Sequence, residues 1–410
     1  MTALLPPAVI LLAILAWGVD LPYSDQWALV PQLEARDAGE LRWIDLWQPH
    51  NEHRLFLPRL LMVELAQITG WNIVGELVVN WLLACGILAA LLHMVRETLP
   101  TRPWWLAPLL SCVVFNPSQW ENWSWGWQIQ IFLCVSAVVT GIALLVRAEV
   151  PWRFAAAVCC GWVATLSFAN GLLFWPLALP LVAHPREHRW PRVGLWLVST
   201  VLCFGAYFRG LGGGGDLPSV PALAGYAATY LGAFFINRWT AVAAILGWVA
   251  LGMLVPLATR LRHTVVERYG ATMPWLVLAA FGLASAGLTA LGRAQFGVDQ
   301  ALSSRYITIS QLFWIGCLGI LWVAEWKIPR RITVPSVGLA LVLLTLGAAH
   351  SAWTWRASSH IRADLRADLL RSIYTVDDTR LVHLWPDPVV VRDHLGRLEH
   401  LEMSLYRSPN

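Results

Sequence analysis

Two short polar segments near the N-terminus carry the side chains best suited to catalysis. Asp25 follows the first apolar run of the chain, and the run His50-Asn-Glu-His-Arg54 lies a little further on. A carboxylate close to a membrane lies near a low-dielectric boundary, where its charge interacts strongly, so Asp25 is suited to act as a general base. We therefore predict Asp25, Glu52 and His50 as catalytic residues. The structural alternative for Asp25 is capping of a helix that begins at Gln26.

The same run supplies candidate ligands for a metal ion and for a substrate. Asp25, His50 and Glu52 are residue types that bind divalent metals, which makes such an ion a candidate cofactor. No His-Glu-x-x-His spacing is present, so a zinc protease has no motif support. We predict that the remaining members of the run bind substrate: Asn51, His53 and Arg54. The alternative is a hydrogen-bonded polar knot that only shapes the loop.

Residues 116–128 combine aromatic and polar side chains. Four tryptophans fall within eight residues, from Trp120 to Trp127. Aromatic faces suit the apolar C–H face of a sugar ring, and an acid or amide at the rim can bind its hydroxyl groups. We therefore predict that Glu121, Asn122 and Gln128 bind substrate. Anchoring of the tryptophans at the membrane interface is the alternative.

Two arginines flank a short polar connection at residues 292–306. Arg293 and Arg305 would bind an anionic headgroup or a phosphate through bidentate contacts, and we predict that Tyr306 accompanies them. The alternative is that both arginines snorkel to the membrane interface. Asn170 is a further candidate for substrate binding, although it lies in an Asn-Gly turn of a kind that is mostly structural.

A membrane protein must position these segments. Of the 410 residues, 57% are hydrophobic and 13% are charged, against about 25% charged in a soluble domain. This composition excludes a single soluble domain and a disordered chain. We predict an all-α polytopic fold with about 11 transmembrane helices, because apolar runs of about 20 residues can cross a bilayer. The predicted spans are 3–19, 72–95, 103–116, 127–147, 152–167, 170–183, 192–208, 239–259, 273–291, 305–325 and 333–351. The run 220–236, interrupted by Pro and Gly, is expected to lie at the interface.

Positive charge predicts the orientation of these helices. One set of connections holds 13 basic and five acidic residues, whereas the alternate short connections hold only Arg209, Arg238, Arg293 and Arg305. The basic set is expected in the cytoplasm, and the N-terminus with it. Residues 20–71 then form a large non-cytoplasmic loop with short helices, within a transmembrane domain of residues 1–351. Residues 352–410 form a small non-cytoplasmic segment, and all the polar segments described above fall on the same outer face.

Several of these segments together resemble the polytopic C-type glycosyltransferases and glycosyltransferase-like bacterial membrane proteins. They comprise residues 23–27, 50–54, 121–128, 169–171 and 304–306, with a long first outer loop that carries an acid near its start. The resemblance extends from this loop to about residue 325. It implies a multi-pass protein of the bacterial inner membrane, a polyprenyl-phosphate-linked sugar donor, and transfer on the non-cytoplasmic face, with Asp25 as the outer-loop acid. The sequence departs from the family in lacking an Asp-Asp, Asp-Glu or Glu-Asp pair there, which leaves the catalytic and metal-binding roles of Asp25 open.

We therefore expect a membrane glycosyltransferase that transfers a sugar to a lipid, glycan or protein acceptor. Asp25 would act as general base with help from Glu52 or His50, while Arg293 and Arg305 neutralise the departing phosphate. The nearest alternative is an O-antigen polymerase or ligase that uses a diphosphate-linked glycan. A lipid or glycan flippase is another, although the spans hold few charges and no repeat is seen; a scaffold without activity is the last. Membrane lipids are expected as partners, and nucleic acid is not.

Overall fold

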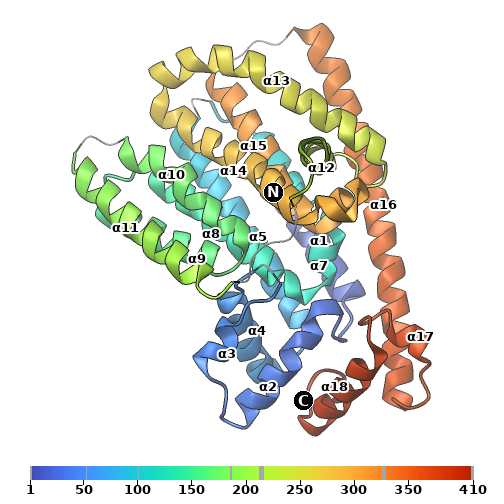
Figure 1. The fold of residues 1–410 in the computed structure, drawn as a ribbon. Helices are drawn as coiled ribbons and strands as arrows, with labels where there is room; N and C mark the ends of the chain where they lie inside the picture. The colour runs from blue at the N-terminus through green and yellow to red at the C-terminus, as the bar shows by residue number, and fades with distance from the viewer. Residues whose placement is uncertain are drawn as a thin grey trace.

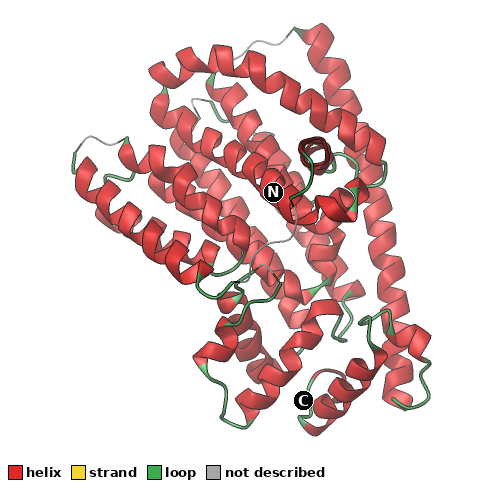
Figure 2. Ribbon diagram, viewed as in Figure 1, coloured by secondary structure: helices red, strands yellow, loops and turns green. Residues whose placement is uncertain are grey.

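The protein is built from helices throughout the part of the chain that the structure describes. This computed structural model describes residues 2–51, 53–99, 101–184, 187–211, 217–325 and 329–407. Within these ranges the regular elements are α-helices and short 3-10 helices (Figures 1 and 2), and the one isolated β-bridge pairs His50 with His53. The helical class predicted from the sequence is therefore confirmed.

Seven helices among the described residues are long and apolar enough to cross a membrane. Each coincides with a predicted span, because an uninterrupted apolar run of this length satisfies its own backbone hydrogen bonds in lipid. The seven are α5 (Ile73–Thr98), α8 (Ile129–Leu145, preceded by η4, Gly126–Gln128), α11 (Arg189–Phe208), α13 (Thr240–Glu267), α14 (Tyr269–Arg293), α15 (Ile307–Val323) and α16 (Arg330–Arg371). Their length and composition identify a membrane-embedded protein.

The four other predicted spans correspond to shorter helices. Pro117 explains part of the shortening, because it follows the helix within 103–116, and a 3-10 turn replaces the start of the helix within 170–183. The helices are α1 (Leu5–Trp17), α6 (Leu106–Val114), α9 (Pro151–Thr165) and α10 (Phe174–Ala183, preceded by η5, Ala169–Leu173). The structure therefore supports seven of the eleven predicted crossings by length.

Helix α16 joins the membrane part to the C-terminal segment without a break. It contains 42 residues, which corresponds to about 63 Å at 1.5 Å per residue, and it extends along one side of the whole molecule (Figure 1). Neither Pro nor Gly occurs between Ala348 and Arg371, so nothing stops the helix at the predicted boundary between residues 351 and 352. That boundary therefore falls inside one rigid element.

The basic connections lie together at one end of the bundle. Arg147 pairs with Glu97 at 2.7 Å, and Arg192 donates to the Ala148 carbonyl at 3.0 Å. Arg268 donates to the Val323 carbonyl at 2.8 Å. Since Glu97 lies at the far end of α5 from Ile73, this end is opposite the polar segments. The predicted alternation of the loops between two faces agrees with these contacts.

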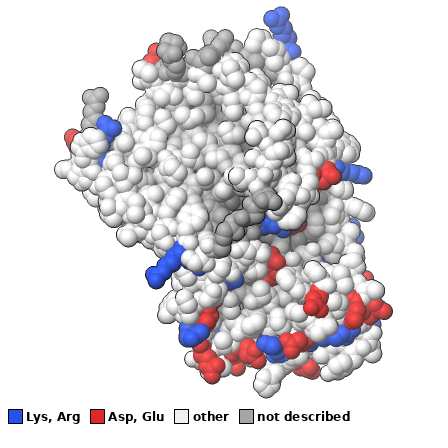
Figure 3. Space-filling view, viewed as in Figure 1, with Lys and Arg blue, Asp and Glu red and all other residues white. Residues whose placement is uncertain are grey.

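A second layer covers the other end of the bundle. It combines the short helices of the first loop with the C-terminal cap, which we define as residues 372–407. The helices of this layer are η2 (Ser24–Leu29), α2 (Val30–Asp37), α3 (Trp43–Trp47) and α4 (Phe56–Thr69), with α17 (Asp378–Leu381) and α18 (Pro388–His400). Positive and negative side chains gather over this layer, whereas most of the surface above it is uncharged (Figure 3).

The C-terminal cap packs directly on the first loop, although more than 300 residues separate them. Arg397 pairs with Glu34 at 3.0 Å, and the Ser404 amide donates to the Gly70 carbonyl at 2.8 Å. Helix α18 packs against α2. The first loop and the C-terminal cap therefore form one structural unit.

Helix α12 (Val220–Gly232) crosses the bundle direction. Figure 1 shows α12 end-on, whereas α16 extends from top to bottom along the right side of the picture. It packs closely on α13, where Gly232 and Gly247 leave no room for a side chain. This helix of 13 residues is not among the candidate spans, and it brings Tyr226 and Tyr230 toward the loop that follows α14.

Candidate functional site

The structure brings all five predicted polar segments together. The Trp125 indole donates to the Tyr23 carbonyl at 2.9 Å, and the rings of His50 and Trp127 lie 5.0 Å apart. His53 stacks on Phe168 with ring centroids 4.4 Å apart. The Ser304 hydroxyl donates to Glu121 at 2.7 Å. Segments spread over almost 300 residues therefore meet at the end of the bundle opposite the basic connections.

Asp25 and His50 form a partly exposed pair of titratable side chains in this site. The His50 Nε2 atom lies 3.8 Å from Asp25 Oδ1, and their side chains are 15% and 27% exposed. No described residue donates a hydrogen bond to the Asp25 carboxylate, and the buried Nε2 atom of His50 makes none in the described part of the chain. Asp25 can therefore accept a proton from a bound molecule, with the imidazole beside it.

The His50 loop is held by its own backbone. His50 and His53 exchange two backbone hydrogen bonds of 2.8 and 3.0 Å, and Asn51 adopts a φ of 51° at the tip. Asn51 is exposed, so its side chain is accessible to a substrate. Glu52, predicted as a catalytic residue and metal ligand, lies outside the described residues.

Arg54 ties the first loop to the end of α11. Its guanidinium donates to the carbonyls of Tyr207 at 2.6 Å, Trp47 at 2.7 Å and Arg209. Burial lowers the pKa of Arg54, and three carbonyl partners satisfy its donors. The Arg59 guanidinium likewise donates hydrogen bonds to the Leu46 and Gln48 carbonyls. The geometry of Arg54 thus favours a structural role over the predicted contact with substrate.

Glu121 is an organising residue of the Trp-rich segment. A single oxygen, Oε2, accepts hydrogen bonds from the Ser303 hydroxyl at 2.9 Å, the Ser304 hydroxyl at 2.7 Å and the Arg305 amide at 3.1 Å. Its neighbour Asn122 donates to the Arg305 carbonyl at 3.0 Å and to Thr308 at 2.6 Å. These two predicted substrate ligands fix the backbone that carries Arg305.

Arg305 lies beside Tyr306, within electrostatic reach of two acids of the site. Its guanidinium lies 5.4 Å from the ring centre of Tyr306 and interacts with the charges of Glu121 and Asp25. Tyr306 accepts a hydrogen bond from Gln300 at 2.9 Å, and Gln300 contacts the Tyr226 hydroxyl. Gln300 and Tyr226 were not predicted, because they gain their role only when α12 packs beside this loop.

The remaining predicted ligands differ in their surroundings. Arg293, at the end of α14, lies over the Phe296 ring at 5.9 Å. Asn170 and Gln128 are buried, and Asn170 Nδ2 and Gln128 Oε1 have no partner among the described residues. Buried polar atoms of this kind are usually satisfied by water or a ligand.

The tryptophans of residues 120–127 are mostly core residues. Trp123, Trp125 and Trp127 are buried, and Trp123 stacks on Phe115 with centroids 5.9 Å apart. The expected sugar platform and the alternative, an interfacial belt, both require exposed faces. Neither description fits these three rings, because neighbouring helices cover them inside the bundle.

No three His, Cys, Asp or Glu side chains come close enough to hold a metal ion in the described ranges, which omit Glu52. Asp25 and His50 approach one another as a pair. A pair of this composition suits proton transfer, since a protein site for a divalent metal usually supplies at least three ligands.

Sequence reasoning missed two buried charged residues beside the site. Glu76, only 1% exposed, accepts hydrogen bonds from Gln26 at 2.6 Å and Trp71 at 3.0 Å. Arg362, 5% exposed, donates to the Ser124 carbonyl at 2.8 Å and lies 5.3 Å from the Tyr23 ring centre. The signal for Glu76 was an acid inside a predicted span, where charged residues are costly and often functional.

Comparison with known proteins finds no relative of this chain. No family model matches the chain, and no curated protein or solved structure matches it either. The function must therefore be argued from the site itself.

Proposed function

We propose that this protein is a membrane glycosyltransferase that moves a sugar from a polyprenyl-phosphate-linked donor to a lipid, glycan or protein acceptor. The observation that carries the proposal is the pairing of a partly exposed Asp25 with His50, 3.8 Å apart, within the electrostatic reach of Arg305. An acid that can take a proton and a guanidinium that can bind a phosphate are the two groups that such a transfer needs.

In this reaction Asp25 removes the proton of the acceptor hydroxyl. The oxygen forms its bond to the anomeric carbon of the sugar while the bond from that carbon to the lipid phosphate breaks. Arg305 binds the phosphate that leaves, and His50 orients the Asp25 carboxylate. The resemblance to C-type glycosyltransferases is consistent with these roles.

The proposal includes the placement of the chain in the membrane. We infer a bacterial inner membrane protein with eleven crossings, four of them by the shorter helices α1, α6, α9 and α10. The basic connections lie in the cytoplasm with the N-terminus, and the site and the C-terminal cap lie outside. The donor reaches the site from the bilayer, where its polyprenyl chain is soluble. A divalent metal ion remains a candidate cofactor, with Asp25, His50 and Glu52 as its predicted ligands.

The proposal is tested by transfer of radiolabelled sugar from a polyprenyl-phosphate donor in membranes that contain the full chain. Asp25→Asn is expected to lower the rate by about 10²–10⁴-fold, and Arg305→Ala by about 10²–10³-fold. Matched controls are Asp37→Asn and Arg238→Ala, since both side chains are exposed. Full activity in both site variants would refute the assignment. Use of a diphosphate-linked donor alone would favour the polymerase or ligase alternative.

A further inference from the structure

The C-terminal cap surrounds the turn that carries Asp25. We propose that the cap and the outer end of α16 hold Asp25 in its reactive position, with the Leu384 carbonyl and Arg362 as positioning groups. This inference rests on the proposed function, in which Asp25 is the base. The cap would then be part of the catalytic apparatus, although no cap residue contacts the substrate.

The most direct contact lies one residue before Asp25. Ser24 adopts a left-handed backbone with a φ of 51°, a conformation that is unfavourable for residues other than glycine. Its amide donates to the carbonyl of the buried Leu384 at 2.7 Å. This hydrogen bond stabilises the strained residue, and the direction in which Asp25 leaves the backbone depends on it.

Further cap contacts bracket the same turn. The ring of Trp27 lies 6.4 Å from the ring of His394 in α18. At the other side, Arg407 pairs with Asp20 at 3.1 Å, and Arg366 of α16 donates to the Asp20 carbonyl at 2.9 Å. C-terminal residues therefore hold the chain before, at and after the turn.

Arg362 connects this turn with the Trp-rich segment. Its guanidinium donates to the Ser124 carbonyl and lies over the Tyr23 ring. The Tyr23 carbonyl in turn accepts a hydrogen bond from the Trp125 indole. Burial of a cation is costly unless its hydrogen-bond donors are satisfied. Loss of the contact with Ser124 would therefore be unfavourable for Arg362. Arg362 thereby fixes the distance between the Asp25 turn and the segment of Glu121, which positions Arg305.

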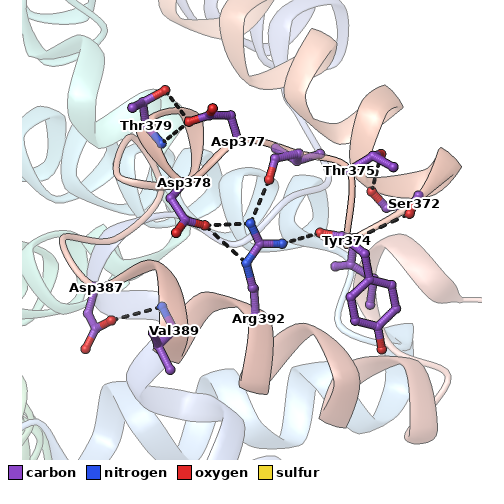
Figure 4. A network of polar contacts seen from close by, with 11 residues as sticks. Ser372, Tyr374, Thr375, Asp377, Asp378, Thr379, Asp387, Val389 and Arg392 are labelled. Atoms are coloured by element: carbon purple, nitrogen blue, oxygen red, sulfur yellow. Dashed lines mark hydrogen bonds and ion pairs between the residues drawn. The ribbon is translucent and has the colours of Figure 1, made fainter.

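The cap has its own organising residue, which lies away from the site. Arg392 donates to the Val376 carbonyl at 2.7 Å, to Asp378 at 2.5 Å and to the Ile373 carbonyl (Figure 4). These bonds close the loop between α16 and α17. Arg392→Gln should therefore loosen the cap without changing any residue that contacts Asp25.

The experiment measures hydrogen exchange of the peptide that contains Ser24 in the full chain in lipid nanodiscs, together with sugar transfer. In Arg392→Gln the Ser24 amide is expected to exchange at least about tenfold faster, and kcat to fall about tenfold or more with little change in KM. The matched control is Arg371→Gln, because Arg371 is exposed and pairs with Asp368, three residues before it on the same helix. Unchanged exchange at Ser24 in a folded Arg392→Gln protein overturns the inference.

A second substitution separates positioning from general destabilisation. Glycine adopts a positive φ without strain, so Ser24→Gly added to Arg392→Gln should recover about fivefold of the lost kcat, whereas Ser24→Ala should recover none. Equal behaviour of the two variants contradicts the role of the strained turn. If the wild-type chain transfers no sugar, the proposed function fails, while exchange at Ser24 still decides whether the cap holds the turn.

Discussion

Asp25 and Glu121 are both single acids at the same end of the helix bundle, but the structure places them in opposite environments. One oxygen of Glu121 accepts three hydrogen bonds from the segment Ser303–Arg305. Asp25 receives none from the described residues and has His50 at 3.8 Å. A carboxylate with its acceptors filled has little capacity to take a proton, whereas one without donors retains it.

This difference gives the two acids of one site different roles, structural for Glu121 and chemical for Asp25 in the proposed function. Glu121 fixes the backbone of Arg305, the residue that binds the phosphate in the proposed function. Asp25, the proposed base, is left available at the end of a turn that other elements hold. The site thus joins a rigid cationic half to an acidic half that depends on the C-terminal cap.

The largest effect on stability is expected at Glu121. Glu121→Ala leaves the two serine hydroxyls and the Arg305 amide without their acceptor, which should lower the free energy of unfolding by about 2–4 kcal/mol. Asp25→Ala removes no such partner and should change it by less than about 0.5 kcal/mol. Thermal unfolding in detergent micelles measures both. Equal destabilisation by the two variants would contradict the contrast between the acids.

A smaller effect is expected at Glu76, which extends the comparison to a fully buried acid. Both carboxylate oxygens accept from donors, Gln26 and Trp71, so Glu76→Gln places an NH₂ group against one of them. We expect a loss of about 1–3 kcal/mol in the free energy of unfolding. Glu76→Asp, which keeps the carboxyl group but shortens the side chain, is the companion variant. A Glu76→Gln protein as stable as the wild type would show that the two bonds are dispensable.

The smallest effect is a pH dependence on the Asp25 side. Burial, with a further contribution from Arg397, lowers the pKa of His394 in α18, whereas an unfolded histidine titrates near about 6.5. As the pH falls below that value, the unfolded state binds more protons than the folded one, so stability decreases. The temperature at the midpoint of thermal unfolding should therefore decrease as the pH is lowered from 7.5 to 5.5. The decrease should be smaller in His394→Gln. An identical decrease in that variant would assign the effect to other groups.

Much of the fold could be predicted from local patterns. Seven long apolar runs became helices of the predicted kind, because lipid leaves a chain no other way to satisfy its backbone. Of the other four predicted spans, the one at 152–167 matches α9 to within two residues at each end, whereas those at 3–19, 103–116 and 170–183 contain α-helices shorter than predicted. The continuation of α16 to Arg371 could have been predicted from the absence of Pro and Gly.

The candidate site was only partly accessible to sequence reasoning. The polar segments were identified, and they do converge. Glu76 and Arg362 were missed because their importance comes from contacts with Gln26 and Ser124, which lie 50 and 238 residues away. The tryptophans were misplaced for the same reason: their burial depends on neighbours such as Phe115 and Phe132.

The sequence by itself determined that this is a helical membrane protein whose candidate site segments lie at one end of the bundle, since apolar length and charge placement act locally. Only the tertiary structure decided which of the acids in these segments is held and which is available. The hydrogen bonds that occupy Glu121 come from residues more than 180 positions away, and the turn before Asp25 is held by the distant Leu384 carbonyl. Whether a carboxylate is satisfied depends on such partners, and no local pattern specifies them.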